Sequence, residues 1–261
     1  MLFNGPLDAV PLWALLAGTV AITAGAIEVG YRLGRWRRTK IEDETEALLG
    51  AIVAATLALL GFIVAFTFSL AATWAAARRE IVVTEANTLG TTYLRAGLIP
   101  DGRGATIRRL LREYVDERLE VIETRDVDRL LERSAELHRE LWNEAEAAGR
   151  EHPDSIAVGL FINSLNESID THSRRVLVSL QNRPAIPIWA SLYAATILTM
   201  TGVGYQQGLS RSRRTPAIAV RVLTFSVILA LIADLDRPQD GWLRTSQQAI
   251  VELRKSMSPP L

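Results

Sequence analysis

The chain has 261 residues, of which 49% are hydrophobic and 22% are charged. Lys and Arg together number 29, as do Asp and Glu, so the chain lacks the overall basic charge that favours nucleic-acid partners. Cysteine is absent, which excludes disulfides, thiolate nucleophiles and cysteine metal sites.

Four long apolar stretches lie at 11–31, 48–77, 185–205 and 217–233. Each is close to the roughly 20 apolar residues that a helix needs to cross a bilayer. The alternative, the buried helices of a soluble bundle, would give these stretches polar faces, and they have none. The sequence therefore predicts an all-α, multi-pass protein of the cell membrane (the bacterial inner or plasma membrane), with the lipid bilayer as its partner.

Two charged residues lie within these spans. Glu28 is near the end of the first span, and Arg221 is near the start of the fourth. A charge at membrane depth is costly enough to need a partner or an aqueous cavity. Both positions are near the same side of the membrane, so the two residues either reach the interface, pair with each other or serve a function.

The second span carries a face of small residues beside a face of large apolar ones. Small residues at helical spacing allow close approach of another helix. They are Ala58, Gly61, Ala65, Ser69 and Ala72. The adjacent face holds Phe62, Phe66 and Leu70, which would form an apolar constriction if identical subunits surrounded an axis. Alternatively, the phenylalanines face lipid or fill the core of one subunit.

Charged residues also follow the second and fourth spans. They are Arg78, Arg79 and Glu85 after the second span, and Asp234, Asp236 and Arg237 after the fourth. Both spans end on the same side of a four-span topology, so we expect an ion-pair latch between these groups. Calcium binding by the two aspartates is less favoured, because calcium takes about six to eight oxygen ligands.

The segment 98–184 is predicted to be a polar helical module inserted between transmembrane helices two and three. Its apolar residues repeat at spacings of three and four, and no strand alternation is present. Residues 1–97 then hold the first two transmembrane helices with the polar extension of helix 2. Residues 185–261 hold transmembrane helices 3 and 4 with the C-terminal tail.

The sequence offers little support for catalysis or for a cofactor. The three histidines, His138, His152 and His172, have no metal-ligand spacing, so no metal is expected. No nucleophile elbow, phosphate-binding glycine loop or pair of carboxylates within a span is present. We therefore expect a protein that is not an enzyme and that has no nucleic-acid partner.

The flanking charges do not decide which side of the membrane the module faces. Cytoplasmic loops carry an excess of Lys and Arg. One side has Arg32, Arg35, Arg37, Arg38, Lys40, Arg211, Arg213 and Arg214, and the other has Arg78, Arg79, Arg95, Arg174, Arg175, Arg183, Arg237 and Arg244. The two sets are equal in number.

Several short motifs, taken in order, resemble the bacterial bestrophin-like family over nearly the whole chain. They are Gly30-Tyr31-Arg32-Leu33-Gly34-Arg35, Gly61-Phe62, Ala65-Phe66-Thr67-Phe68-Ser69, Arg78-Arg79, Glu85-Ala86-Asn87, Gly90-Thr91-Thr92-Tyr93-Leu94-Arg95, Leu98-Ile99-Pro100 and Asp234-Leu235-Asp236-Arg237-Pro238 with Gly241. Bestrophins are pentameric anion channels whose second span lines the pore with an apolar neck. Gln239 stands where an aromatic residue would fit the bestrophin pattern, which argues against calcium gating.

The resemblance implies a homo-oligomeric ion channel with a neck at Phe62 and Phe66 and a cytoplasmic module. Inorganic ions would then be its partners. An alternative is a stator-like or scaffolding membrane assembly, which shares the four-span layout but does not itself conduct ions. A proton-driven stator needs a protonatable path, and spans three and four have no carboxylate at mid-depth, which favours the channel. A sensor whose module binds a ligand is a third reading, but no output domain is recognisable.

Overall fold

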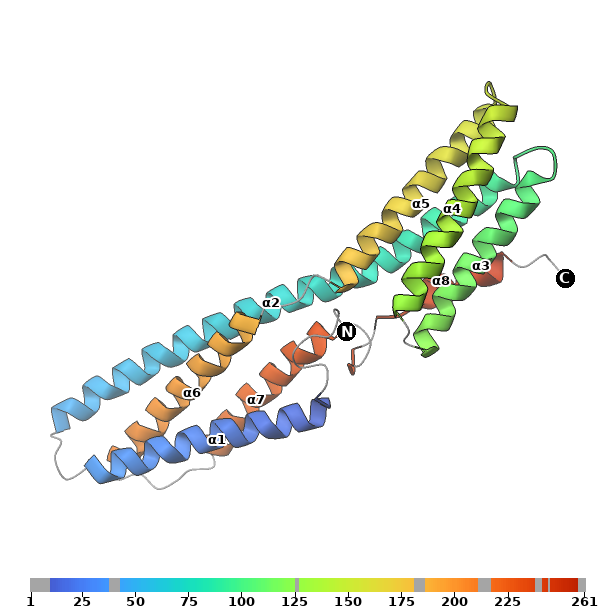
Figure 1. The fold of residues 1–261 in the computed structure, drawn as a ribbon. Helices are drawn as coiled ribbons and strands as arrows, with labels where there is room; N and C mark the ends of the chain where they lie inside the picture. Colours follow the sequence, from blue (N-terminus) through green and yellow to red (C-terminus); the bar gives the residue numbers. More distant parts are fainter. Residues whose placement is uncertain are drawn as a thin grey trace. The chain divides into compact units, whose positions relative to one another are not determined.

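The structure, a computed structural model, describes residues 10–37, 43–124, 127–180, 186–210, 217–237, 241–243 and 245–257. Within these ranges it has eight helices and no strand, which confirms the all-α prediction (Figure 1). The helices are α1 (Leu12–Arg37), α2 (Asp43–Ala96), α3 (Arg103–Thr124), α4 (Val127–Glu151), α5 (Ile156–Leu180), α6 (Ile186–Leu209), α7 (Ala217–Asp236) and α8 (Gln248–Ser256). Several loop residues used in the charge comparison, Arg38, Lys40, Arg183, Arg211, Arg213, Arg214 and Arg244, lie outside the described residues, as do Pro238 and Gln239.

Four of the described helices are long and apolar enough to cross a membrane, as the sequence predicts. They are α1, the Leu48–Ala96 stretch of α2, α6, and the Ile218–Asp236 stretch of α7. Helix α2 has 54 residues, or about 80 Å at 1.5 Å per residue. A hydrocarbon core is about 30 Å thick, so only part of α2 can lie within it.

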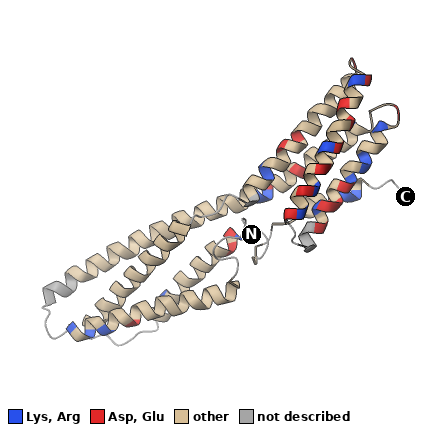
Figure 2. Ribbon diagram, viewed as in Figure 1, with Lys and Arg blue, Asp and Glu red and all other residues tan. Residues whose placement is uncertain are grey.

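The chain forms two compact units. Unit 1 comprises Met1–Ala76 and Asn182–Arg244, and unit 2 comprises Ala77–Gln181 and Thr245–Leu261. Helix α2 contributes to both. Unit 2 thus takes in the end of α2 and the C-terminal tail, which the sequence analysis grouped with the transmembrane helices. Among the described residues, most of the charged ones lie on the helices of unit 2, as the colours of the ribbon in Figure 2 show.

In unit 1, α1 and α6 pack closely through glycines. A Cβ atom at Gly30 would lie 2.0 Å from the carbonyl oxygen of Thr201, and one at Gly34 would lie 2.2 Å from that of Tyr205. The two contacts advance together along both helices, so α1 and α6 run parallel. Their glycines, Gly30 and Gly34 on α1 with Gly204 and Gly208 on α6, form two small-xxx-small motifs that bring the backbones together.

Helices α2 and α7 run antiparallel to this pair. Gly50 and Val53 of α2 face Gln206 and Gly202 of α6, in reverse order along the chain. The hydroxyls of Ser226 on α7 and Thr23 on α1 are 3.3 Å apart, and Arg237, just after α7, donates to the carbonyl of Val10, just before α1, so α7 runs in the opposite direction to α1. The alternating directions are those that four successive crossings of a membrane require.

Unit 2 has an apolar core built by α3, α4, α5, α8 and the end of α2. Tyr114 and Phe161 are among its largest fully buried side chains. Helix α8, which the apolar pattern of the sequence does not predict, adds Ile250 and Leu253 to this core. Met257, which follows α8 directly, is also buried. Its carbonyl accepts a hydrogen bond from the Tyr93 hydroxyl at 2.9 Å.

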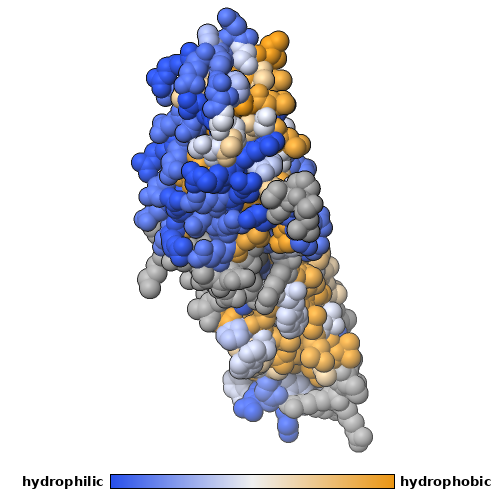
Figure 3. All heavy atoms as spheres, turned by 90° about the vertical axis from the view of Figure 1, so that its right-hand side faces the viewer, coloured by the Kyte–Doolittle hydropathy of each residue, from blue (hydrophilic) through white to orange (hydrophobic). Residues whose placement is uncertain are grey.

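The surfaces of the units follow this division. In Figure 3, hydrophilic residues cover much of the surface of unit 2, and apolar residues predominate on the described surface of unit 1. Apolar side chains such as Trp13 and Leu198 are about three-quarters exposed in unit 1. An exposed apolar surface of this extent fits contact with lipid or with other subunits.

Candidate functional site

The predicted neck residues lie on an exposed face of α2. The side chains of Phe62 and Phe66 are 70% and 65% exposed, and Leu70 is half-buried. The buried face of the same stretch carries Leu60 and Val64. The phenylalanines therefore do not fill the core of unit 1. Contact with lipid is the alternative that is left beside a position in a pore.

The small residues of α2 form a second exposed face. Ala58, Gly61, Ala65 and Ser69 are exposed, and Ala72 is half-buried. A Cβ atom at Gly61 would have no neighbour within 4 Å, so the described chain does not use this glycine for helix packing. At 3.6 residues per turn, the centre of this face is roughly 80° from that of the phenylalanine face. The close helix contact inside unit 1 comes instead from the glycines of α1 and α6.

One of the two charges within the spans has a partner on its own helix. Glu28 accepts a hydrogen bond from Nε of Arg32, one turn along α1, at 2.9 Å, and both side chains are exposed. An i, i+4 pair of this kind at the end of a span fits the predicted position near the interface. Arg221 is half-buried on α7. The pairing of Glu28 with Arg221 stays a prediction.

Glu85 is the centre of a buried polar cluster in unit 2. Its side chain is 1% exposed and binds two arginines. Nε of Arg175 is 3.0 Å from Oε1, and a terminal nitrogen of Arg118 is 3.1 Å from Oε2. A buried charge requires such compensation, because its desolvation costs several kcal/mol in practice. This cluster ties α2 to α3 and α5.

Two histidines and a tyrosine extend the cluster. The Tyr114 hydroxyl donates to Oε1 of Glu85 at 3.1 Å and lies 2.8 Å from Nδ1 of His172. The His138 ring stacks on Tyr114 with a centroid distance of 5.1 Å, and it meets the edge of His172 at 4.8 Å. The cluster thereby joins α4 to the other three helices.

Burial decides the protonation of these histidines. It lowers the pKa of His138 to about 4. Burial, followed by the positive charge of Arg175, lowers the pKa of His172 to about 3. Burial and the neighbouring Glu85 carboxylate raise the pKa of Tyr114. At neutral pH, the cluster therefore contains one carboxylate, two guanidinium groups and neutral rings.

The sequence contains a signal for the burial of Glu85, although not for its partners. Val82, Ala86 and Leu89 are buried and repeat at helical spacing, and Glu85 lies within that stripe. The partners are 33 and 90 residues away along the chain. The predicted latch of Arg78, Arg79 and Glu85 with the acidic residues after α7 stays a prediction.

Asp234 holds residues 242 and 243 beside the end of α7. Its carboxylate accepts backbone hydrogen bonds from Trp242 at 2.6 Å and Leu243 at 3.1 Å. A Cβ atom at Gly241 would lie 2.5 Å from Oδ1 of Asp234, so a larger residue there would displace this carboxylate. A terminal nitrogen of Arg237 donates to the carbonyl of Val10 at 2.6 Å. Within unit 1, this part of the predicted latch thus serves local structure.

A metal-compatible group lies where the α2–α3 and α4–α5 turns meet in unit 2. Asp101, Glu151 and His152 each place a ligand atom within 4.8 Å of the others. Nε2 of His152 is 2.7 Å from Oδ2 of Asp101, and Arg103 binds Glu151 at 2.6 Å. These contacts hold the two turns together, and the ion pair with Arg103 competes with any cation.

Comparison with known proteins identifies one family. A family model described as a bestrophin-like domain matches residues 17–250. This range begins in α1 and ends in α8, so it includes the helices of both units. No curated protein and no solved structure matches the chain.

Proposed function

The chain belongs to the family with a bestrophin-like domain, and we propose that it assembles into a homo-oligomeric ion channel of the cell membrane. The family relation to bestrophins favours a pentamer that conducts anions. Helices α3–α5 then form a polar module inserted between the second and third spans, on the cytoplasmic side.

One observation carries this proposal: the phenylalanine face and the small-residue face of α2 are both exposed and adjacent. A helix that lines a pore must present one face to the axis and another to its neighbours. Phe62 and Phe66 supply large apolar side chains for the first role. Gly61, with open space around it, suits the second.

An apolar ring excludes ions because water leaves a narrow constriction and the protein offers no replacement for the hydration shell. Removal of the phenyl groups should therefore widen the pore and let water fill it. We expect the variant with Phe62→Ala and Phe66→Ala to show higher conductance or open probability than wild type. Single-channel recording in planar bilayers with asymmetric chloride measures this and reports the ion selectivity.

Phe68→Ala is the matched control for this experiment, since Phe68 is half-buried on another face of α2. This change should lower the melting temperature and leave the currents unaltered. Unchanged currents in the Phe62/Phe66 variant would refute the neck. Absence of current from assembled wild-type protein would favour the stator or scaffold alternative.

Oligomerisation is tested at Gly61. Leucine at this position fits the isolated subunit, because nothing lies within 4 Å of a Cβ there, but it prevents close approach of a second helix. We expect Gly61→Leu to remove the high-mass species in native mass spectrometry without lowering the melting temperature of the subunit. A wild-type protein that is monomeric in nanodiscs would contradict the proposal.

A further inference from the structure

The side of α2 that carries Phe62 continues as an exposed stripe towards the end of the helix. An α-helix makes five turns in about 18 residues, so position 80 lies on the same side as position 62, about 27 Å further along. Exposed residues occupy this side at spacings of three and four, and they are Phe62, Phe66, Ser69, Thr73, Ala76 and Glu80. The stripe therefore leads from the two phenylalanines to a carboxylate.

Glu80 is the one charged residue on this stripe. Arg78 and Arg79 precede it in the sequence, but they lie on other sides of the helix. Arg78 is buried. Arg79 lies about 100° from Glu80 around the helix and about five turns after Gly61, so it belongs to the side of the small residues. Within the described part of the chain, the exposed carboxylate of Glu80 has no ion-pair partner.

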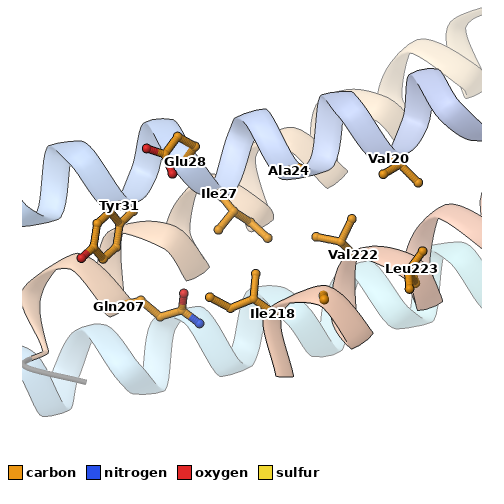
Figure 4. Close-up of a pocket in the computed structure, with 10 residues that line it drawn as sticks. Val20, Ala24, Ile27, Glu28, Tyr31, Gln207, Ile218, Val222 and Leu223 are labelled. Atoms are coloured by element: carbon orange, nitrogen blue, oxygen red, sulfur yellow. The ribbon is translucent and has the colours of Figure 1, made fainter. Parts of the chain in front are cut away.

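An ion path inside one subunit would need a cavity with polar walls, because these replace the hydration shell of the ion. Figure 4 shows a groove of about 520 Å³ between α1 and α7 of unit 1. Most of its lining residues are apolar, among them Val20, Ile27, Val222 and Leu223. This groove therefore does not compete with the exposed stripe of α2 as the ion path.

The place of Glu80 along α2 suits a charged ring at the mouth of a pore. The apolar run of the second span reaches Ala77, so Glu80 follows directly after it. At 1.5 Å per residue, Glu80 lies about 21 Å beyond Phe66. If the phenylalanines face the axis of an oligomer, each subunit places one carboxylate around the same axis. A ring of acidic side chains concentrates cations and repels anions, and such rings provide the charge selectivity of cation channels.

We propose that Glu80 of each subunit contributes to a carboxylate ring at the mouth of the pore, and that this ring makes the channel prefer monovalent cations to chloride. The inference rests on the proposed function, because it requires Phe62 and Phe66 to face the axis. It goes beyond that function by naming the residue that sets the charge selectivity. The ring opposes the anion conduction that the family relation favours. Arg79 lies further from the axis, on the side that faces the neighbouring subunit.

The test is the reversal potential of the full-length protein in planar bilayers with asymmetric KCl. Wild type should reverse near the equilibrium potential of potassium. Glu80→Gln keeps the size of the side chain and removes its charge, so it should lower the permeability ratio of potassium to chloride by about tenfold, the lower end of the range for focused charge. Glu132→Gln, at an exposed position on α4, is the matched control and should leave the ratio unchanged. The effect of Glu80→Gln should shrink near 1 M salt, where the screening length is about 3 Å.

The absence of cysteine from the chain permits a second test by chemical labelling. Glu80→Cys introduces a single thiol and removes the carboxylate. A negatively charged methanethiosulfonate reagent restores the charge and should restore the cation preference, whereas a positively charged reagent should turn the preference towards chloride. Neither reagent should change the selectivity of wild type or of Glu132→Cys.

The outcomes separate this inference from the proposed function. A wild type that prefers chloride, or an unchanged permeability ratio in Glu80→Gln, would overturn the inference and leave the channel in place. Equal effects of Glu80→Gln and Glu132→Gln would also overturn it, because a charge elsewhere on the surface would then have the same influence. Absence of current from assembled wild-type protein would contradict the proposed function, and the inference with it.

Discussion

The α1–α6 interface of unit 1 and the Glu85 cluster of unit 2 join helices by opposite means. The first is formed where side chains are missing, at Gly30, Gly34, Gly204 and Gly208. The second is formed where charged side chains are buried together. Lipid is as apolar as leucine, so helices in a membrane associate through close van der Waals contact, for which glycine leaves room. In unit 2, apolar burial stabilises the helices, and the surrounding core makes a compensated charge cluster tolerable.

The largest expected effect comes from breaking the charge compensation in unit 2. Glu85→Gln leaves the guanidinium groups of Arg118 and Arg175 buried without a carboxylate between them. Loss of one partner of a buried ion pair costs about 3–5 kcal/mol. We expect a large drop in the melting temperature of the purified protein. The control is Glu80→Gln at an exposed position of the same helix, and equal melting temperatures for the two variants would contradict this view of the cluster.

The corresponding change in unit 1 adds one methyl group. A Cβ atom at Gly204 would lie 2.0 Å from the carbonyl oxygen of Ile27, a backbone atom that cannot move without its helix. Overpacking of this kind costs about 1–3 kcal/mol. We expect Gly204→Ala to reach the upper end of that range in a thermal melt, with α1 and α6 separating first.

Gly25→Ala on α1 is the matched control for the tight interface. No atom lies within 4 Å of a Cβ at that position, and alanine favours a helix over glycine by about 1 kcal/mol. The same change from glycine to alanine should therefore stabilise the protein at position 25 and destabilise it at position 204. If both substitutions shift the melting temperature in the same direction, the close packing of α1 and α6 is not what stabilises unit 1.

The third prediction concerns pH and acts on unit 2 alone. His138 and His172 have pKa values of about 4 and 3 in the folded protein, against an ordinary value of 6.5. Below pH 6.5, the unfolded chain binds protons that the folded chain excludes. The contribution of the two histidines to stability is therefore fully present above pH 6.5 and is lost as the pH falls towards 4 for His138 and towards 3 for His172. Linkage gives a loss of about 2 kcal/mol from each histidine at pH 5.

Amide hydrogen exchange at pH 7.5 and pH 5, corrected for the intrinsic rates, can follow this loss. We expect α3–α5 to lose protection while α1 and α6 keep it, because the titrating rings lie in unit 2. Replacement of His172 by Gln should reduce the difference in protection of α3–α5 between the two pH values. Replacement of His152, which lies outside the cluster, should not. A uniform loss in both units would mean that the acid sensitivity arises elsewhere.

The sequence predicts the elements better than their partners. The four spans follow from apolar runs whose length is set by the bilayer. The motifs Gly30-x3-Gly34 and Gly204-x3-Gly208 are also visible in the sequence, but they become an interface only when α1 and α6 are known to be neighbours. The small-residue pattern within the second span instead favours Gly61, which has open space around it in the structure.

Sequence periodicity also predicts neither short helices nor contacts between residues far apart in the chain. Helix α8 has nine residues and contains Glu252, Arg254 and Lys255, so it lacks the length and apolar content that identify a helix from its sequence. Its two buried residues matter only because α3 and the end of α2 present a surface to them. Similarly, the buried stripe of α2 predicts that Glu85 needs partners, but not that Arg118 and Arg175 supply them.

The smallest expected effect on stability concerns an arginine–carboxylate ion pair at the surface, which has the same chemistry as the buried pairs of Glu85. Arg254 of α8 binds Asp116 of α3 through two nitrogens, one of them at 3.1 Å, with side chains 32% and 52% exposed. Water and salt screen such a pair, so its contribution is about 0.2–1 kcal/mol. We expect Asp116→Asn to lower the melting temperature slightly at low salt and not at all near 1 M salt, where the screening length falls to about 3 Å. Glu85→Gln should remain strongly destabilising at both salt concentrations, because its buried arginines are out of reach of counterions. A salt-independent loss for Asp116→Asn would show that the pair fixes α8 by geometry, and burial would then no longer explain the difference between the two arginine–carboxylate contacts.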